Sequence, residues 1–298
     1  MSDSAEGKDW IEIGRWVAEV QTISSDRSAY PLAADSLLAG DEKGMPPGVS
    51  VAAVVRSLLD SAIDDLSAAL DSISPGKIHP VGIATLTRGA VELAGLGMWV
   101  LTGSKRQGRQ QRALRVAHDS AFNAARFFRG LADSSGTPMP VREESVQAAE
   151  LRTEACDQIV AAAARLGIKK TTVTARLDRT GHLQEVDKAR DTDFLQKWQL
   201  CSGYAHGLAW AAEFFNRHLY THEMEGGGRL QGAQLPADRA LAMLGWGRHA
   251  IEELQGTFTA GRTAMPGWGD DATLFSGRPE KAGKLFPGRS FEHIDMPD

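Results

Sequence analysis

Residues 194–220 read FLQKWQLCSGYAHGLAWAAEFFNRHLY, and the fold assignment starts from this stretch. Apolar side chains recur along it near the period of a helix with one buried face. They are Phe194, Leu195, Trp198, Cys201, Ala205, Leu208, Ala209 and Ala212. The pattern predicts one helix over residues 194–220, with His206 in its middle. Each glycine inside a helix costs about 0.5–1 kcal/mol relative to alanine, so Gly203 and Gly207 indicate a purpose other than helix stability.

Helical periodicity on both sides of this stretch predicts five further long helices. They span residues 51–73, 81–102, 104–131, 141–166 and 237–259, and a short opening helix follows Asp9. Residues 22–48 and 169–193 lack the period and are predicted as a loop and a connector. Few segments alternate with period two. The predicted fold class is therefore all-α, a bundle of about six long antiparallel helices without a sheet of three or more strands.

The same pattern divides the chain into three regions. Residues 1–48 form a short helix and an irregular loop, residues 49–262 form the bundle domain, and residues 263–298 form an irregular tail rich in Gly and Pro. A tail of this composition is not regular, but its aromatic side chains could anchor it along the bundle or on a protein partner. These are Trp268, Phe275, Phe286 and Phe291.

Composition narrows the class of protein. The chain has 298 residues, 42% of them hydrophobic, and a formal net charge of −5, which suits a globular protein and not a general nucleic-acid binder. No apolar run reaches the length of a membrane span, and the acidic N-terminus does not resemble a secretory signal, so we expect a cytoplasmic protein without membrane contact. The two cysteines, Cys156 and Cys201, lie in helical apolar patterns and predict buried thiols, with no cofactor implied.

Arg88 and Glu92 are the only charged residues of the predicted helix over residues 81–102. They are one turn apart and share a face. One interpretation is an exposed pair that contributes a few tenths of a kcal/mol, on a helix otherwise buried. The other is that the pair faces the interior of the bundle, where His206 or its neighbours supply the partners that buried charges need.

The predicted helix over residues 104–131 carries a basic face opposite an apolar one. Lys105, Arg109, Arg112 and Arg115 belong to that basic face and form a candidate binding surface for nucleic acid. The alternative is a solvated face that pairs with acids elsewhere in the chain.

His218 and His222 have the i, i+4 spacing that lets two imidazoles of one helix bind a metal. No third ligand is fixed by spacing, and two exposed histidines near a helix end explain the pattern equally well. We therefore predict no metal site.

Several short motifs together resemble the HEPN-like helical proteins, in an uncharacterised bacterial and phage branch. The motifs are Arg88-xxx-Glu92 with Trp99-Val100-Leu101, Arg109-xx-Arg112, the connector at residues 171–177, and Trp198-xxx-Ser202-Gly203-x-Ala205-His206-Gly207. The resemblance covers residues 81–220. It implies a helical bundle, often dimeric, whose active members are metal-independent ribonucleases of toxin–antitoxin and phage-defence systems that use an Arg and a His with four to six residues between them.

The chain departs from that pattern at one position. If His206 is the family histidine, the resemblance places an arginine where this chain has Gln199. A glutamine can hydrogen-bond a phosphate but cannot supply positive charge to a phosphorane. Lys197, Arg88 or an arginine of the basic helix could substitute.

Three hypotheses remain open from the sequence. The first is a ribonuclease in which His206 is the acid or base, Ser202 and Gln199 orient the phosphate, and Arg88 and Glu92 hold the histidine. The second is a protein that binds RNA or a nucleotide in the same place without turnover. The third is a structural or regulatory protein, such as an antitoxin or phage accessory factor, that acts through protein contacts. We also expect a homodimer, because Ala-rich helix faces suit close packing between protomers.

Overall fold

A computed structural model describes residues 5–26, 28–74, 77–224 and 229–263. Within these residues the chain is all-α with two small hairpins, which confirms the predicted fold class. The helices are α1 (Ala5–Ser25), α2 (Leu37–Asp41), α3 (Val51–Asp71), α4 (Pro80–Leu101), α5 (Arg106–Asp133), α6 (Met139–Arg165), α7 (Lys170–Val173), α8 (Arg179–Arg190), α9 (Phe194–Ala205), α10 (Ala209–Phe215) and α11 (Ala237–Arg262). The strands are β1 (Ile73–Ser74) with β2 (Lys77–Ile78), and β3 (Arg217–Glu223) with β4 (Arg229–Gln234), each an antiparallel pair.

Five of the six long helices lie where periodicity predicts them, and local signals explain their ends. The Ser50 hydroxyl caps α3 by accepting a hydrogen bond from the Ala53 amide at 2.8 Å. Proline occupies the first turn of α4 and α6, where its missing N–H is not needed. Gly167, with φ of +71°, follows the end of α6.

The prediction of one helix over residues 194–220 is wrong. The chain ends α9 at Ala205, forms the short helix α10, and continues as strand β3 from Arg217. At the break Gly207 has φ of +69°, and its amide donates to the Tyr204 carbonyl while the Leu208 amide donates to the Gly203 carbonyl. This is a Schellman C-cap, which requires a left-handed residue at the position of Gly207. His206 is therefore the C-cap residue of α9 and not a mid-helix residue.

Two predicted irregular segments contain helices. The loop over residues 22–48 includes α2, and the connector over residues 169–193 includes α7 and the 12-residue helix α8. The Asp178 side chain caps α8 by accepting from the Gly181 amide. Because α8 is mostly polar and buries few side chains, its periodicity is weak in the sequence.

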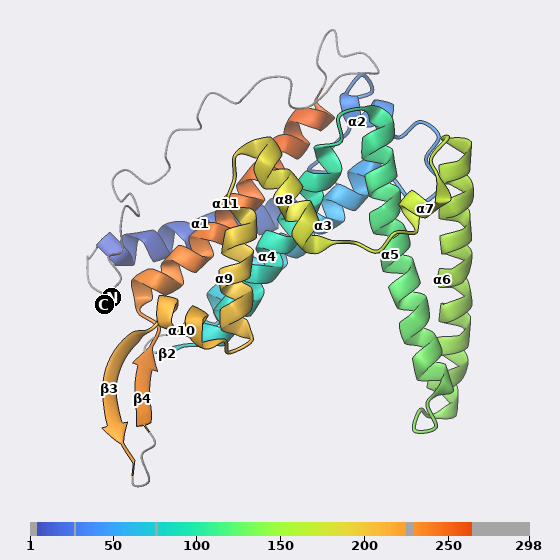
Figure 1. The fold of residues 1–298 in the computed structure, drawn as a ribbon. Coiled ribbons are helices and arrows are strands. Elements are labelled where there is room, and N and C mark those ends of the chain that lie inside the picture. Colours follow the sequence, from blue (N-terminus) through green and yellow to red (C-terminus); the bar gives the residue numbers. More distant parts are fainter. Residues whose placement is uncertain (1–4, 27, 75–76, 225–228, 264–298) are drawn as a thin grey trace.

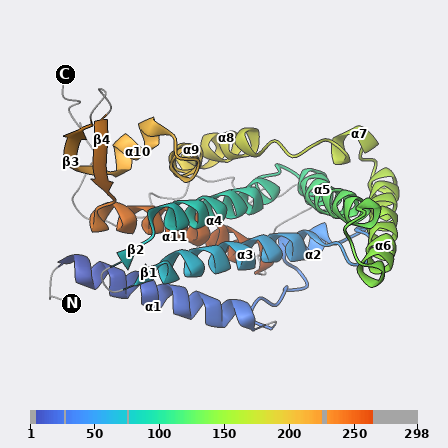
Figure 2. The ribbon, with the colours of Figure 1, turned by 90° about the horizontal axis from the view of Figure 1, so that it is seen from below.

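The core of the body lies where α3, α4 and α11 pack together. Figure 2 shows these helices as the middle of the molecule, with α1 beyond α3 and with α8 and α9 on the other side of α4. Fully buried side chains in this core include Leu59, Leu66, Ile83, Met98 and Leu254. No helix of the described residues is long and apolar enough to cross a bilayer.

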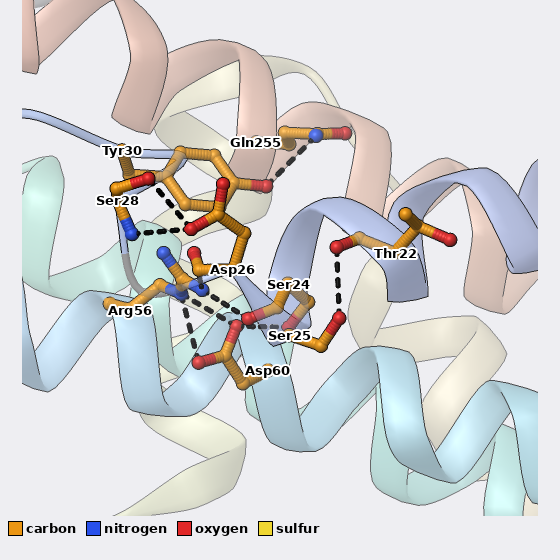
Figure 3. A network of polar contacts seen from close by, with 9 residues as sticks. All are labelled: Thr22, Ser24, Ser25, Asp26, Ser28, Tyr30, Arg56, Asp60 and Gln255. Carbon is orange, nitrogen blue, oxygen red and sulfur yellow. Dashed lines mark hydrogen bonds and ion pairs between the residues drawn. The ribbon is translucent and has the colours of Figure 1, made fainter.

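The N-terminal region is tied to this core. Arg56 of α3 pairs with Asp60 at 2.7 Å, donates to the Ser24 carbonyl and lies over the ring of Tyr30 at 4.2 Å (Figure 3). The Tyr30 hydroxyl in turn accepts a hydrogen bond from Gln255 of α11 at 3.2 Å. Within the described residues, the predicted N-terminal region thus packs on the bundle.

Helices α5 and α6 form a two-helix arm that leaves the body (Figures 1 and 2). At the base of the arm Leu114, Ile159 and Val173 form a small separate core with their neighbours. The hairpin of β3 and β4 projects from the opposite end of the molecule (Figure 1). The predicted tail lies almost entirely outside the described residues.

Candidate functional site

The end of α9 brings His206 next to Arg88 of α4. The Arg88 Nη1 atom lies 3.4 Å from His206 Nε2. Arginine can only donate, so a hydrogen bond between the two side chains is accepted by Nε2. The Arg88 Nε atom is buried and has no hydrogen-bond partner in the described structure. The half-buried Arg88 side chain thus approaches an exposed imidazole through its Nη1 end.

The Schellman cap explains why His206 is accessible. Since Gly207 turns the chain away from the axis of α9, the residue before it lies at the helix end and is exposed to solvent. Helices α4 and α9 pack side by side, so Arg88 reaches this end from the neighbouring helix. Gly203 and Gly207 therefore have structural roles, although neither was explained by helix propensity.

Glu92 does not bind His206, which corrects the expectation that it would hold the histidine. Its Oε2 atom accepts a hydrogen bond from Trp198 Nε1 at 2.9 Å, and its Oε1 atom pairs with Arg179 Nη1 at 2.9 Å. Glu92 thereby links α4 to both α8 and α9. The second sequence interpretation expected His206 or its neighbours to supply the partners, and this describes His206 beside Arg88 and Trp198 on Glu92, whereas Arg179 of α8 was not expected.

Gln199 and Ser202 lie on the same side of α9 as His206. They precede His206 by seven and four residues, which places them along one stripe, with Gln199 about 10 Å from the histidine along the axis. Gln199 is exposed and Ser202 is half-buried. Lys197, another proposed substitute for the missing arginine, is instead paired with Asp193 at 2.6 Å.

Cys201 lies on the buried side of α9. Burial raises the pKa of its thiol to about 12, and the nearby charge of Arg88 opposes that rise only weakly. The thiol is therefore neutral and unreactive at physiological pH, and it does not act as a nucleophile in this site.

Trp210 lies at the same end of α9 and was not singled out from the sequence. A Cβ atom on Gly203 would stand 2.5 Å from Trp210 Cζ2, so the indole packs directly on the backbone of α9. The Trp210 side chain remains 50% exposed. An exposed aromatic ring near a cationic group is a common platform for stacking a nucleic-acid base.

The candidate nucleic-acid-binding face of α5 is largely used inside the protein. Arg109 is 1% exposed and forms a bidentate ion pair with Asp41, with Nε at 2.6 Å and Nη2 at 2.9 Å from the carboxylate oxygens. A buried guanidinium cannot contact a polyanion, so Arg109 is a structural residue. Lys105, at the N-cap of α5, is exposed.

Arg112 and Arg115 hold α8 and the segment before it. Arg112 pairs with Glu185 at 2.9 Å and lies over the Trp99 ring at 4.7 Å, while Arg115 donates to the Ala175 carbonyl at 3.0 Å. The alternative interpretation expected acids elsewhere in the chain as partners, and this describes Arg112 with Glu185 but not Arg115, which donates to backbone carbonyls.

Histidine pairs do not create a metal site in the described part of the chain. His218 and His222 lie on strand β3, so the helix spacing does not apply. Four residues of a strand span about 13 Å, too far for one ion. No group of three or more His, Cys, Asp or Glu among the described residues could hold a metal.

Arg179 is the cation that sequence reasoning missed. It is 59% exposed in a segment predicted as a connector, and only the fold brings it to Glu92. The local sequence offers one indication that Arg179 begins a helix, which is Asp178 directly before it, a residue type that often caps helices.

No family model, curated protein or solved structure matches this chain. Function is therefore inferred from the geometry of the site.

Proposed function

We propose that this protein binds RNA through Arg88 and His206 and cleaves it without a metal, as an HEPN-like helical protein of the toxin or phage-defence type. The 3.4 Å approach of Arg88 Nη1 to His206 Nε2 carries the proposal. The sequence pattern lacks an arginine at Gln199, and Arg88 supplies a guanidinium to the same imidazole from another helix.

The pair suits a phosphodiester for two reasons. The Nη1 end of Arg88 lies against His206 at the exposed end of α9, and a phosphate oxygen is a strong acceptor for a guanidinium. His206 is exposed, so a scissile phosphate can reach both side chains. Trp210 at the same helix end offers a face for an adjacent base.

The chemistry assigned to the pair is transfer of a phosphodiester to the neighbouring ribose hydroxyl. His206 removes the proton of the 2′-hydroxyl, the 2′-oxygen bonds to phosphorus, and the bond from phosphorus to the 5′-oxygen breaks. The leaving 5′-oxygen takes a proton from a solvent water, the His206 imidazolium returns its proton to the solvent, and the products are a 2′,3′-cyclic phosphate and a 5′-hydroxyl. Arg88 stabilises the added charge on the phosphorane oxygens, while Gln199 and Ser202 line the approach.

The test uses end-labelled single-stranded RNA with EDTA present. The wild-type protein should cleave it, and His206→Ala and Arg88→Gln should each lower the cleavage rate at least 100-fold. Gln199→Arg should bind the RNA more tightly, because it adds a cation on the stripe of His206. Arg152→Gln, on the exposed side of α6, is the matched control and should cleave at the wild-type rate.

A second candidate is a non-catalytic structural or regulatory protein that acts through protein contacts. The observation that favours it is the number of exposed apolar side chains on the projecting arm, among them Phe127 at 64% and Leu151 at 65%. RNA binding that is absent from the wild type and unchanged in all four variants would favour this second function and overturn the first.

A further inference from the structure

We propose that residues 165–179, from the end of α6 to the start of α8, bind the phosphate backbone of single-stranded RNA and lead it to Arg88 and His206. We call these residues the basic segment. They add a second contact surface to the RNA site, so the inference rests on the proposed function for its ligand. The binding itself requires no cleavage and is tested without it.

The basic segment concentrates positive charge in an acidic chain. Residues 158–184 contain one acid, Asp178, and five cations, whereas the whole chain has 38 acids and 33 cations. All five cations are exposed, and in the described part of the chain the first four of them have no ion-pair partner. Clustered cations are the electrostatic mark of a surface that binds nucleic acid. The five are Arg165, Lys169, Lys170, Arg176 and Arg179.

Three acids lie beside these cations and do not cancel their charge. They are Asp178 within the segment, Glu92, which pairs with Arg179, and Asp119 of α5, which like Lys170 acts on the charge of a nearby histidine. Five cations minus three acids leave an excess of two positive charges, in a chain whose net charge is −5. The segment is therefore a local site of attraction for a polyanion.

The backbone of the basic segment is held in place although most of it is not helical. Arg115 of α5 donates to the Ala175 carbonyl at 3.0 Å and also to the Arg176 carbonyl. Val173 is fully buried in the small core at the base of the arm, and the Asp178 side chain caps α8. A surface that is already fixed loses less conformational entropy when it binds a ligand.

The surface is polar as well as cationic, and this decides the kind of ligand. Thr171 and Thr174 are exposed between the cations, and no large hydrophobic side chain is exposed between Leu151 and Leu208. Protein interfaces have an apolar centre, and helices on a membrane surface insert apolar side chains. A nucleic-acid backbone requires neither, because its phosphates are bound by cations and hydroxyls.

The basic segment leads to the candidate site along one side of the molecule. Figure 2 shows α7, the connection from α7 to α8, and then α8 and α9, in a row on the side away from α1. Arg179 pairs with Glu92 at 2.9 Å, and Glu92 is one turn of α4 from Arg88. Lys170 precedes Arg179 by nine residues, a span of at most about 32 Å. A strand of several nucleotides thus reaches from these cations to His206.

The binding test uses the full chain and a fluorescent 20-nucleotide RNA with 2′-O-methyl groups, which cannot be cleaved because the attacking hydroxyl is blocked. One variant combines Lys169→Gln, Lys170→Gln and Arg176→Gln. Anisotropy should show binding weakened at least tenfold at 100 mM KCl. The loss of three phosphate contacts should also reduce the slope of log K against log [KCl] by about two.

The matched control combines Arg15→Gln, Arg126→Gln and Arg152→Gln, which removes three exposed cations from other surfaces. It has the same net charge as the first variant and should bind the RNA within about threefold of the wild type. Circular dichroism checks that both variants are folded. The proposal is overturned if the wild type does not bind, if the first variant binds like the wild type, or if both variants are weakened equally. Binding of the wild type to anionic phospholipid vesicles and not to RNA would also overturn it.

Cleavage assays distinguish failure of this inference from failure of the proposed function. The first variant should raise the KM for a cleavable 20-nucleotide RNA at least tenfold and leave kcat unchanged. It should cleave a dinucleotide, which is too short to reach Lys170, at the wild-type rate. Slower cleavage of the dinucleotide would place the variant's effect on the Arg88–His206 pair and overturn the inference. If the wild type cleaves neither substrate, the proposed function fails, and the binding test still decides whether the basic segment holds RNA.

Discussion

Asp41 and Arg109 form a bidentate ion pair that is closed off from solvent. Asp41 is 0% exposed and Arg109 is 1% exposed, and Nη1 of the arginine also donates to the Gly103 carbonyl at 3.1 Å. Burial raises the pKa of Asp41, and the hydrogen bond and charge of Arg109 oppose that rise. The pair joins α2, in the N-terminal region, to the start of α5.

Removing the arginine of this pair should destabilise the whole protein. Arg109→Met leaves the Asp41 carboxylate buried without its partner, so the free energy of unfolding should fall by about 3–5 kcal/mol. Urea denaturation measures the change. Arg126→Met, at an exposed position of the same helix, is the control and should change stability by about 0.5 kcal/mol or less. Equal effects of the two changes would contradict the structural role of Arg109.

Replacement of His206 should hardly change the stability of the protein. Its side chain is exposed at a helix end, so His206→Ala should change the free energy of unfolding by about 0.5 kcal/mol or less. Thermal denaturation of the variant beside the wild type measures this. A loss of more than about 2 kcal/mol would show that the histidine mainly joins α9 to α4, and a loss of RNA cleavage could then not be assigned to chemistry.

The close contact of Trp210 with Gly203 can be tested by comparing two glycine-to-alanine substitutions, one at Gly203 and one at Gly256. Gly203→Ala places a methyl group on the indole, so we expect a loss of about 1–3 kcal/mol and a shift in tryptophan fluorescence. Gly256→Ala in α11 meets no atom within 4 Å and should stabilise the protein by about 0.5–1 kcal/mol. If both substitutions stabilise the protein, Trp210 does not rest on α9 in solution.

His182 should make stability depend on pH. It is 3% exposed and stacks on Trp99 with ring centroids 3.8 Å apart. Burial, and then the charge of Arg115, lower its pKa from 6.5 to about 4. Between these values the unfolded chain binds the proton and the folded chain does not, so this histidine lowers stability as pH falls from 6.5 to 4.

The expected size of that effect is on the order of 2–3 kcal/mol across the window. It is measured as the difference in urea stability between pH 7 and pH 4.5 for the wild type and for His182→Phe, which keeps an aromatic ring on Trp99. His118 and His249 also have lowered pKa values and remain in both proteins, so the comparison isolates His182. An identical pH dependence in the two proteins would contradict a buried neutral His182.

Sequence periodicity predicted the long helices because each one buries a single apolar face against the core. It failed after Ala205, since the helical period of apolar residues continues through Leu208 and Ala212 while the backbone does not. The stop signal is local: Gly207 follows His206, and a glycine just beyond a helix is a common terminator. The prediction gave these glycines a functional meaning that the C-cap and the Trp210 contact make unnecessary.

The candidate site was predictable only in part, because its contacts join distant segments. Arg88 and His206 were both named from motifs, and their approach across 118 residues depends on the packing of α4 with α9. The choice of Glu92 as partner of the histidine was wrong, since nothing in the sequence places Trp198 and Arg179 beside that carboxylate. The amphipathic pattern of α5 likewise does not reveal that α2 covers Arg109.

The two-helix arm also has a consequence for the timescales of motion in this protein. Its outer turns have no neighbour in the described chain except each other, and their interface is made of small side chains. Such a segment can open without opening the α3–α4–α11 core, at a lower free energy than global unfolding. Backbone amides near the tip of the arm should therefore exchange their hydrogens with solvent faster than those of the core. A contact that covers the arm would lower the exchange rate of these amides and leave the rate of the core amides unchanged.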